Sequence, residues 1–272
     1  MKPYIFICLL FITLFSSCIV ERPTYYVSPL NGNSTSYHAI PLKKDSIKTA
    51  TYASGSLYFG SANTSQTDKV FQFEGAVYQT KQFGIFEAYY GANVLLGNYK
   101  VTPFDTASFY TNANWKALNA RSGNKLYEGI GVEGGIDLVH VTRHGEWRII
   151  GAELSTHQEF GDYVSFRKNL PADAANLIIR SGNLTTIGFN TETIRKTKQG
   201  SYSLKFAYGF NLGKAYTNAQ ALDFTTQTVE HIPYRYATLT FQYTYQKWSG
   251  YVSSTGGDYA NGFRLGAIYR LH

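Results

Sequence analysis

The chain alternates apolar and polar residues with a period of two over long stretches, which predicts β-strands. In residues 126–139 the even positions include Leu126, Ile130 and Val132, whereas the odd positions are mostly Gly, Glu and Asp. Such runs reach ten or more residues, about twice the usual strand length in soluble proteins. Tilted strands of ~9–11 residues span a bilayer. The alternation therefore predicts strands with one apolar face toward lipid and one polar face toward a lumen.

Nine segments show the alternation clearly, and a weaker tenth lies around 251–255, before the turn signal Gly256-Gly257-Asp258. The connections at 81–83 and 143–146 are short, whereas those at 98–124 and 159–182 are long. Outer-membrane barrels combine short periplasmic turns with long external loops and have an even number of strands. The nine clear segments are 50–61, 70–80, 84–97, 126–139, 147–158, 183–194, 202–213, 234–245 and 262–271.

We therefore expect an all-β protein, an up-and-down antiparallel transmembrane β-barrel of roughly 8–10 strands with ten favoured. Its connections should be long outside and short in the periplasm. The barrel domain is expected to cover 46–272. The segment 18–45 before it is polar and interrupted by prolines, which predicts a tether.

The N-terminus predicts a lipoprotein signal. Lys2 is followed by an apolar run from Tyr4 to Phe15, then by Ser16, Ser17 and Cys18. Charge, apolar segment and small residues in that order are typical of a secretory signal peptide, here 1–17. A cysteine at the cleavage point indicates acylation of Cys18 by a palmitate-type chain, which we expect in the inner leaflet of the outer membrane. Cys8 lies within the signal, so the mature chain has no thiol for a disulfide framework or a cysteine metal site.

Composition narrows the class of partner. The chain has 25 Lys+Arg against 18 Asp+Glu, but its basic residues occur only as scattered pairs. A nucleic-acid surface needs a basic stripe, so no nucleic-acid partner is expected. Anionic lipid head groups are the more natural partners of this charge. The chain also has 23 Tyr and 18 Phe, and Tyr favours a membrane interface, where one end of its side chain is apolar and the other wet.

Part of the sequence resembles a known group. Tyr37-His38-Ala39-Ile40-Pro41-Leu42 leads into Ser46–Gly55, and Ala88-Tyr89-Tyr90-Gly91-Ala92-Asn93 follows. These stretches resemble a group of Bacteroidota outer-membrane lipoproteins that have a short lead followed by an up-and-down barrel. The resemblance covers the lead and roughly the first three strands. It implies architecture and location, and no catalytic residues.

Charged residues on the polar faces predict a luminal ion-pair network, because buried charges must be paired. Acidic residues lie on early strands and basic ones on late strands, so we expect them to meet across the lumen. No nucleotide loop is indicated, and the six His show no metal-ligand spacing, so no cofactor is expected. The expected network comprises Glu87, Glu133, Asp137, Glu153, Lys205 and Arg264.

One group of side chains suggests an enzyme. Glu153, Ser155 and His157 lie on one face of a predicted strand, and Ser, His and an acid form the site of barrel lipid A deacylases. Positions i and i+4 on a strand are about 13 Å apart, so Glu153 cannot orient His157. The face is also expected to be luminal rather than lipid-facing. We expect a polar lumen wall and no catalysis, with an envelope lipid-modifying enzyme using Ser155 and His157 as the alternative.

Function is then expected at the external loops. A barrel of this size is too narrow for an open aqueous channel, and clustered exposed aromatic residues mark binding surfaces. We expect a structural or binding role, as an anchor or accessory subunit, with outer-membrane lipid and another envelope protein as partners. A tethered periplasmic barrel that binds an apolar ligand is a further alternative, and there the apolar faces would point inward. The candidate binding loop carries Tyr99, Phe104, Phe109, Tyr110 and Trp115.

Overall fold

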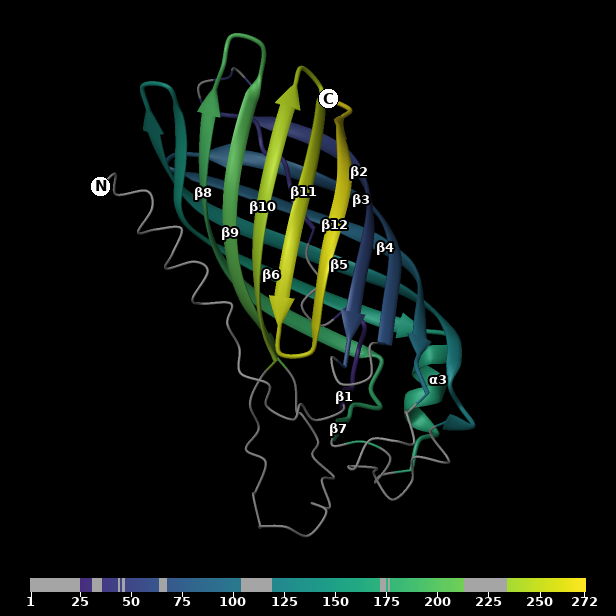
Figure 1. The fold of residues 1–272 in the computed structure, drawn as a ribbon. Helices are drawn as coiled ribbons and strands as arrows, with labels where there is room; N and C mark the ends of the chain where they lie inside the picture. The colour runs from purple at the N-terminus through teal and green to yellow at the C-terminus, as the bar shows by residue number, and fades with distance from the viewer. Residues whose placement is uncertain are drawn as a thin grey trace, which may run out of the picture.

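The computed structural model describes residues 25–30, 36–43, 45, 47–63, 68–103, 119–171, 175, 177–212 and 234–272. Within them ten strands form a closed barrel in which each strand is antiparallel to both neighbours (Figure 1). The strands, in the order in which they follow one another around the barrel, are β2 Thr49–Ala62, β3 Asp68–Phe83, β4 Phe86–Val101, β5 Gly123–Thr142, β6 Gly145–Phe160, β8 Asn183–Lys196, β9 Ser201–Leu212, β10 Arg235–Tyr245, β11 Trp248–Gly257 and β12 Ala260–Arg270.

The ten-stranded barrel confirms the fold class. The weak tenth strand around 251–255 is β11, which pairs with β10 and β12 along its length. β12 in turn pairs with β2, and this pairing closes the sheet. An even strand number brings the two barrel termini to the same end, and closure leaves no exposed sheet edge for unwanted pairing.

The two ends of the barrel differ in their connections. We call the end with the turns at 84–85, 143–144, 197–200 and 246–247 the short-turn end. The opposite end, with the connections 102–122, 161–182 and 213–234, is the long-connection end. Short and long connections do not alternate strictly around the barrel, because β11 and β12 are joined at the long-connection end by the tight turn 258–259.

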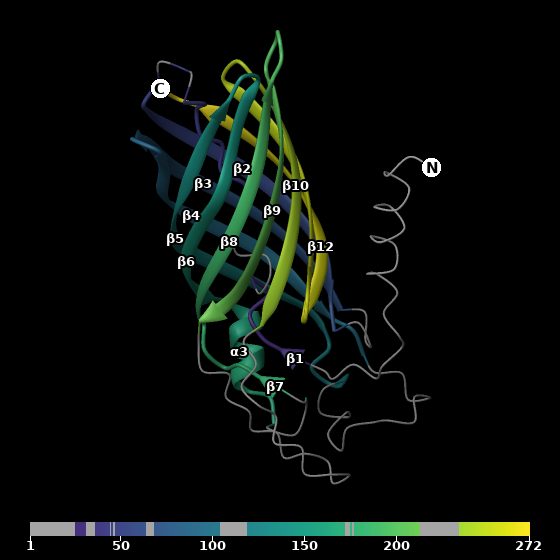
Figure 2. The same ribbon diagram turned by 90° about the vertical axis from the view of Figure 1, so that its left-hand side faces the viewer.

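Three further elements lie at the long-connection end (Figures 1 and 2). They are β1 (Tyr25–Tyr26), α3 (Asp162–Lys168) and β7 (Leu177–Ile178). β1 pairs with β7 in parallel, with Tyr25 opposite Leu177. Among the described residues no helix is long and apolar enough to cross a membrane.

The apolar faces of the strands point outward, as the alternation predicts. Phe206 is 49% exposed and Leu239 47% exposed, whereas the intervening positions of the same strands are mostly buried. A surface of this kind is stable against lipid hydrocarbon and costly in water. The alternative of a soluble barrel holding an apolar ligand needs the opposite arrangement, and the observed faces contradict it.

β6 contains an irregularity that the alternation did not reveal. Ile149 and Ile150 are consecutive and both exposed, and the register shifts between Arg148 and Gly151 on the side facing β8. A β-bulge adds a residue to one strand and reverses the inward and outward positions beyond it. Arg148 therefore points into the lumen together with Glu153, although the two residues have opposite parity in the sequence.

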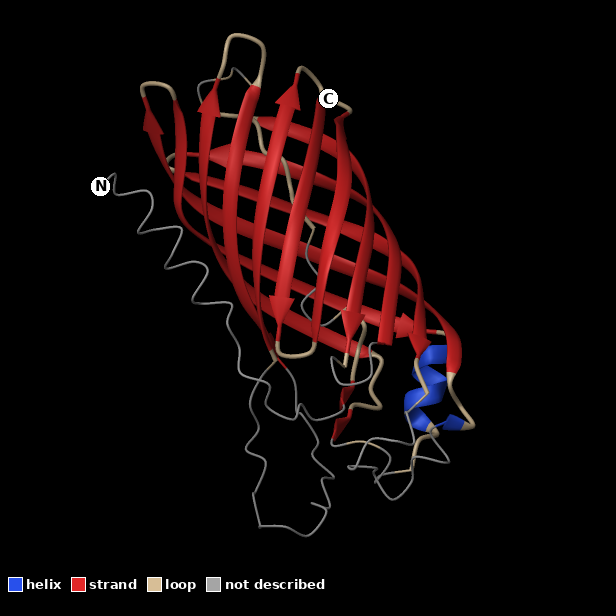
Figure 3. Ribbon diagram, viewed as in Figure 1, coloured by secondary structure: helices blue, strands red, loops and turns tan. Residues whose placement is uncertain are grey.

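Residues 36–42 run through the barrel and are all buried. Figure 3 draws part of this stretch as a loop inside the barrel. We call it the luminal segment. The expectation that 18–45 is a simple tether is therefore wrong for the described part of this range. The physical reason is size: about eight strands enclose a space that side chains just fill, so ten leave room for one additional chain.

Candidate functional site

The luminal segment is hydrogen-bonded to two strands of the barrel wall, β5 and β8, which lie on either side of β6. Tyr37 Oη donates to Glu192 Oε1 of β8 at 2.6 Å, and His38 Nε2 lies 2.8 Å from Glu133 Oε1 of β5. The His38 ring also stacks on Tyr89, with centroids 4.2 Å apart. Successive side chains of an extended chain point in different directions, so Tyr37 and His38 bond to different wall strands.

Its backbone is bonded as well. The Ala39 amide donates to Tyr78 Oη at 2.9 Å, and Arg148 Nη2 donates to the Ile40 carbonyl at 3.3 Å. Lys43 Nζ donates to the Gly84 carbonyl at 2.7 Å at the short-turn end. A buried backbone group without a partner costs free energy comparable to a lost hydrogen bond. These bonds stabilise the segment inside the barrel.

The predicted luminal charge network is present, and most of its members have partners in the described residues. Lys205 pairs with Glu153, and Arg264 pairs with Glu74 on β3, so basic residues of late strands do meet acidic residues of early ones. Glu133 pairs with His38 of the luminal segment rather than with a wall residue. Asp137 is also buried in the lumen, and its Oδ1 has no hydrogen-bond partner among the described residues.

The centre of this network is a residue that the sequence did not single out. Arg148 Nε donates to Glu87 Oε2 at 3.0 Å, and its Nη1 donates to Glu192. Arg148 is 1% exposed and bonds two strands and the luminal segment. Strict alternation places it on the lipid side with Leu154, and only the bulge at Ile149 and Ile150 turns it inward. One signal in the sequence could have revealed the bulge: strict alternation places a charged residue on the lipid face, where a charge lowers the stability of the barrel.

Glycines make room for large luminal side chains on neighbouring strands. A Cβ on Gly97 would lie 2.2 Å from the Tyr127 ring, and one on Gly131 would lie 2.2 Å from the His157 ring. Gly131 of β5 therefore makes room for His157 of β6, and Gly97 of β4 makes room for Tyr127 of β5. At both positions a larger residue would collide with the neighbouring ring.

Ser155 and His157 are both buried on the luminal face of β6. Neither Ser155 Oγ nor either ring nitrogen of His157 has a hydrogen-bond partner in the described part of the chain, so the two do not bond to each other. Glu133, opposite Ser155 on β5, bonds to His38. A nucleophile needs a base within about 2.6–3.2 Å, and this arrangement does not provide one.

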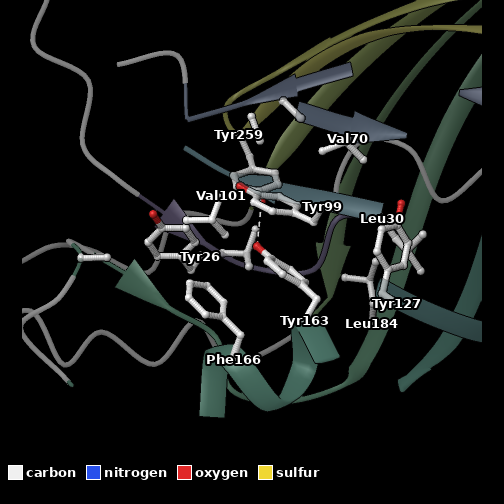
Figure 4. Packing of buried hydrophobic residues seen from close by; sticks show 14 of the residues in the cluster. Tyr26, Leu30, Val70, Tyr99, Val101, Tyr127, Tyr163, Phe166, Leu184 and Tyr259 are labelled. Carbon is white, nitrogen blue, oxygen red and sulfur yellow. Dashed lines mark hydrogen bonds between the residues drawn. The ribbon is translucent and has the colours of Figure 1, made fainter. Parts of the chain in front are cut away.

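The long-connection end is closed by a cluster of buried aromatic side chains (Figure 4). Tyr99 and Tyr163 stack with centroids 4.1 Å apart, and Tyr259 Oη donates to Tyr99 Oη at 3.2 Å. We call this cluster the tyrosine cap. It comprises Tyr26, Tyr99, Tyr127, Tyr163, Phe166 and Tyr259. Burial raises the pKa of Tyr163 and of Tyr259, so both remain neutral hydroxyls and share a hydrogen bond of 3.3 Å.

Tyr99 corrects one expectation. We expected it in an exposed binding loop, but it lies within β4 and is 0% exposed. β4 extends to Val101, and position 99 points inward toward the tyrosine cap. The rest of the candidate loop, Phe104, Phe109, Tyr110 and Trp115, lies outside the described residues, and so does Cys18.

A second set of contacts attaches α3 and the N-terminal residues to the barrel. Arg167 of α3 pairs with Glu159 at the end of β6, and Ser28 Oγ donates to Glu159 Oε1 at 2.6 Å. Phe166 packs edge-on against Tyr26 with centroids 5.3 Å apart. Glu159 therefore bonds both the helix and the chain that precedes the luminal segment.

The short-turn end is aromatic and basic on its outside. Trp147 and Trp248 are exposed next to the turns, and amphipathic rings of this kind sit at membrane interfaces. A cavity of about 290 Å³ opens at this end beside the luminal segment and is lined in part by Tyr37, Ile40 and Arg270. Exposed basic side chains lie at its rim and in the neighbouring turns: Arg143, Arg195, Lys196, Lys198 and Lys247. They suit anionic lipid head groups.

No family model and no curated protein matches this sequence. Solved structures similar to this chain include the β domain of the Bordetella autotransporter BrkA, with 10% identity and a TM-score of 0.41 over 82% of this chain and 99% of that one. An outer-membrane channel from Pseudomonas putida F1 has 8% identity and a TM-score of 0.38 over 86% and 100%. The KdgM porin, in complex with disordered oligogalacturonate, has 10% identity and a TM-score of 0.31 over 80% and 99%. These similarities concern the fold alone.

The closed sheet, its outward apolar face and its charged interior define a membrane-spanning, ten-stranded β-barrel. Within this class the chain has one particular feature: a segment of its own N-terminal region occupies the lumen.

Proposed function

We propose that this protein is an outer-membrane lipoprotein whose barrel is a closed anchor and whose long-connection end binds another envelope component. The observation that carries the closed-anchor role is the luminal segment, which is buried and bonded to the wall strands β8 and β5 through Tyr37 and His38. In a barrel of this diameter, a chain that is bonded inside the lumen occupies the space through which a solute would pass.

The binding role rests on the architecture of the long-connection end. The tyrosine cap and α3 form a packed base there, and the connections 102–122 and 213–234 leave the barrel at the same end. Binding residues commonly lie on loops that a rigid scaffold positions. The aromatic residues of 104–115 fit a contact with another protein, since aromatic side chains are enriched at such interfaces.

The alternative enzyme would use Ser155 and His157. Both side chains are buried on the luminal face of β6, away from lipid. The structure therefore gives more support to a role in packing the polar lumen, where small side chains accommodate the bonded segment.

The first test is conductance in planar bilayers. We expect the wild type to show no sustained open-pore current. The double variant Tyr37→Ser/His38→Gly loses the bonds to Glu192 and Glu133 and should show frequent opening events. The pair Lys198→Ser/Gln199→Gly, in an exposed short turn, is the matched control and should behave as wild type. A steady current through the wild type would contradict the closed-anchor role.

The second test concerns the long connection. Replacing Phe104, Phe109, Tyr110 and Trp115 together with serine should abolish co-purification of a specific envelope protein from detergent extracts. The barrel should still show its heat-modifiable gel shift, because these residues follow the end of β4. The control is again the Lys198→Ser/Gln199→Gly pair. If the serine variant retains the same partner in the same amount, the binding role does not belong to this connection.

A further inference from the structure

The chain enters the barrel at the long-connection end. Tyr25 N donates to Asn63 Oδ1 at 2.8 Å, beside the β2–β3 connection, and Ser28 bonds Glu159 at the end of β6. Residues 36–42 then lie in the lumen, and Lys43 reaches the Gly84 carbonyl in the turn between β3 and β4. β2 begins next to this turn, with Thr49 opposite Lys81.

The order of its contacts along single strands shows the direction in which the N-terminal region runs through the barrel. On β6 the N-terminal region contacts first Glu159, then Arg148, then Glu146, through Ser28, Ile40 and Lys43. On β3 it contacts Glu74 through Ser36 and then Tyr78 through Ala39. Both sequences of contacts run from the long-connection end to the short-turn end. The N-terminal region therefore passes lengthwise through the barrel before the first barrel strand begins.

Chain length limits where Cys18 lies. Seven peptide units separate it from Tyr25, and at ~3.3–3.6 Å each they reach at most about 25 Å. β4 has 16 residues, which at ~3.3 Å each and a tilt of about 40° give a barrel height of roughly 40 Å. Tyr25 is at the long-connection end. Cys18 therefore cannot reach the membrane surface at the short-turn end.

We infer that the acyl chain on Cys18 inserts in the leaflet next to the long connections, which is the outer leaflet, and that the mature N-terminus is exposed at the cell surface. The inference rests on the proposed acylation and on long connections being external. It replaces our expectation of an inner-leaflet anchor, which assumed that the chain before β2 stays on the side where β2 begins. The bonded luminal segment removes that assumption.

The threaded path also constrains assembly. A lipid-bearing end cannot be drawn through a finished, packed lumen, so the barrel has to close around the segment. The closing contact is the pairing of β12 with β2 or of another neighbouring pair. The lipid and the long connections then reach the same side together.

Three single-cysteine variants test the inference in intact cells. Glu21→Cys reports the N-terminus, Lys168→Cys reports the long-connection end, and His144→Cys reports the short-turn end; Lys168 and His144 are both exposed. The probe is a polyethylene-glycol maleimide too large to cross the outer membrane. Folding of each variant is checked by its heat-modifiable gel shift.

We expect positions 21 and 168 to be labelled on intact cells and position 144 only after permeabilisation. Labelling of 168 but not 21 would overturn the threaded path, and labelling of 144 alone would overturn the cell-surface placement. Palmitate incorporation, lost in Cys18→Ala, is measured in parallel. If palmitate does not enter the wild type while 21 and 168 are labelled, the lipoprotein part of the proposed function fails, and the outer-leaflet anchor fails with it.

Discussion

Arg148→Met is expected to lower the free energy of unfolding by about 3–5 kcal/mol, because breaking a buried ion pair leaves uncompensated charge. Arg148 binds Glu87, Glu192 and the Ile40 carbonyl. Without it, Glu87 has no cationic partner among the described residues, and the luminal segment loses a backbone bond. The measurement is urea-induced unfolding in detergent micelles, followed by tryptophan fluorescence.

The matched control for Arg148 is Arg143→Met, in the exposed turn between β5 and β6. Surface substitutions of this kind usually change stability by less than about 0.5 kcal/mol. Adding Glu87→Gln to Arg148→Met should restore part of the loss, since it removes one of the two unpaired carboxylates. Equal unfolding curves for the Arg148 and Arg143 variants would contradict the central role of Arg148.

Phe206→Arg is expected to cost about 2–4 kcal/mol, the range for a charged side chain near the midplane on the lipid face of a barrel. Phe206 lies at the middle of β9 and its ring is on the outside of the sheet. The variant should assemble poorly into phospholipid vesicles, which is measured as the fraction that shows the folded gel mobility.

Phe206→Leu keeps the site apolar and serves as the control, with assembly near that of wild type. An exposed phenylalanine of a water-soluble barrel would tolerate arginine without loss, or with a gain in solubility. Full assembly of Phe206→Arg in lipid, together with solubility in buffer, would mean that the outer face does not contact hydrocarbon.

Period-two alternation was sufficient for most of the wall. It predicted which face of the segments near Leu126, Phe206 and Leu265 points outward, and the structure confirms all three. The weak segment around 251–255 became β11 because a closed sheet needs a partner between β10 and β12. Opposite charges on early and late strands also predicted that Lys205 and Arg264 would meet acids in the lumen.

The positions of Arg148 and Tyr99 were decided only by the tertiary structure. Arg148 points into the lumen because of the bulge at Ile149. The position of a bulge depends on the register with both neighbouring strands, and the local sequence alone does not reveal it. Tyr99 is buried because α3 and the turn before β12 place Tyr163 and Tyr259 against it. In the sequence alone it is one aromatic residue among several near a long connection.

The path of the N-terminal region shows most clearly what the sequence predicts and what only the tertiary structure decides. By itself the sequence determined a barrel wall with a lipid face and a charged face, since each follows from the local alternation of side chains. Residues 36–42 have no such alternation and belong to a segment that Pro29 and Pro41 interrupt, which in the sequence alone predicts a linker. Their burial follows from the width of a ten-stranded lumen and from acceptors on two wall strands, Glu133 of β5 and Glu192 of β8, which are far apart in the sequence and are brought together because both strands pair with β6.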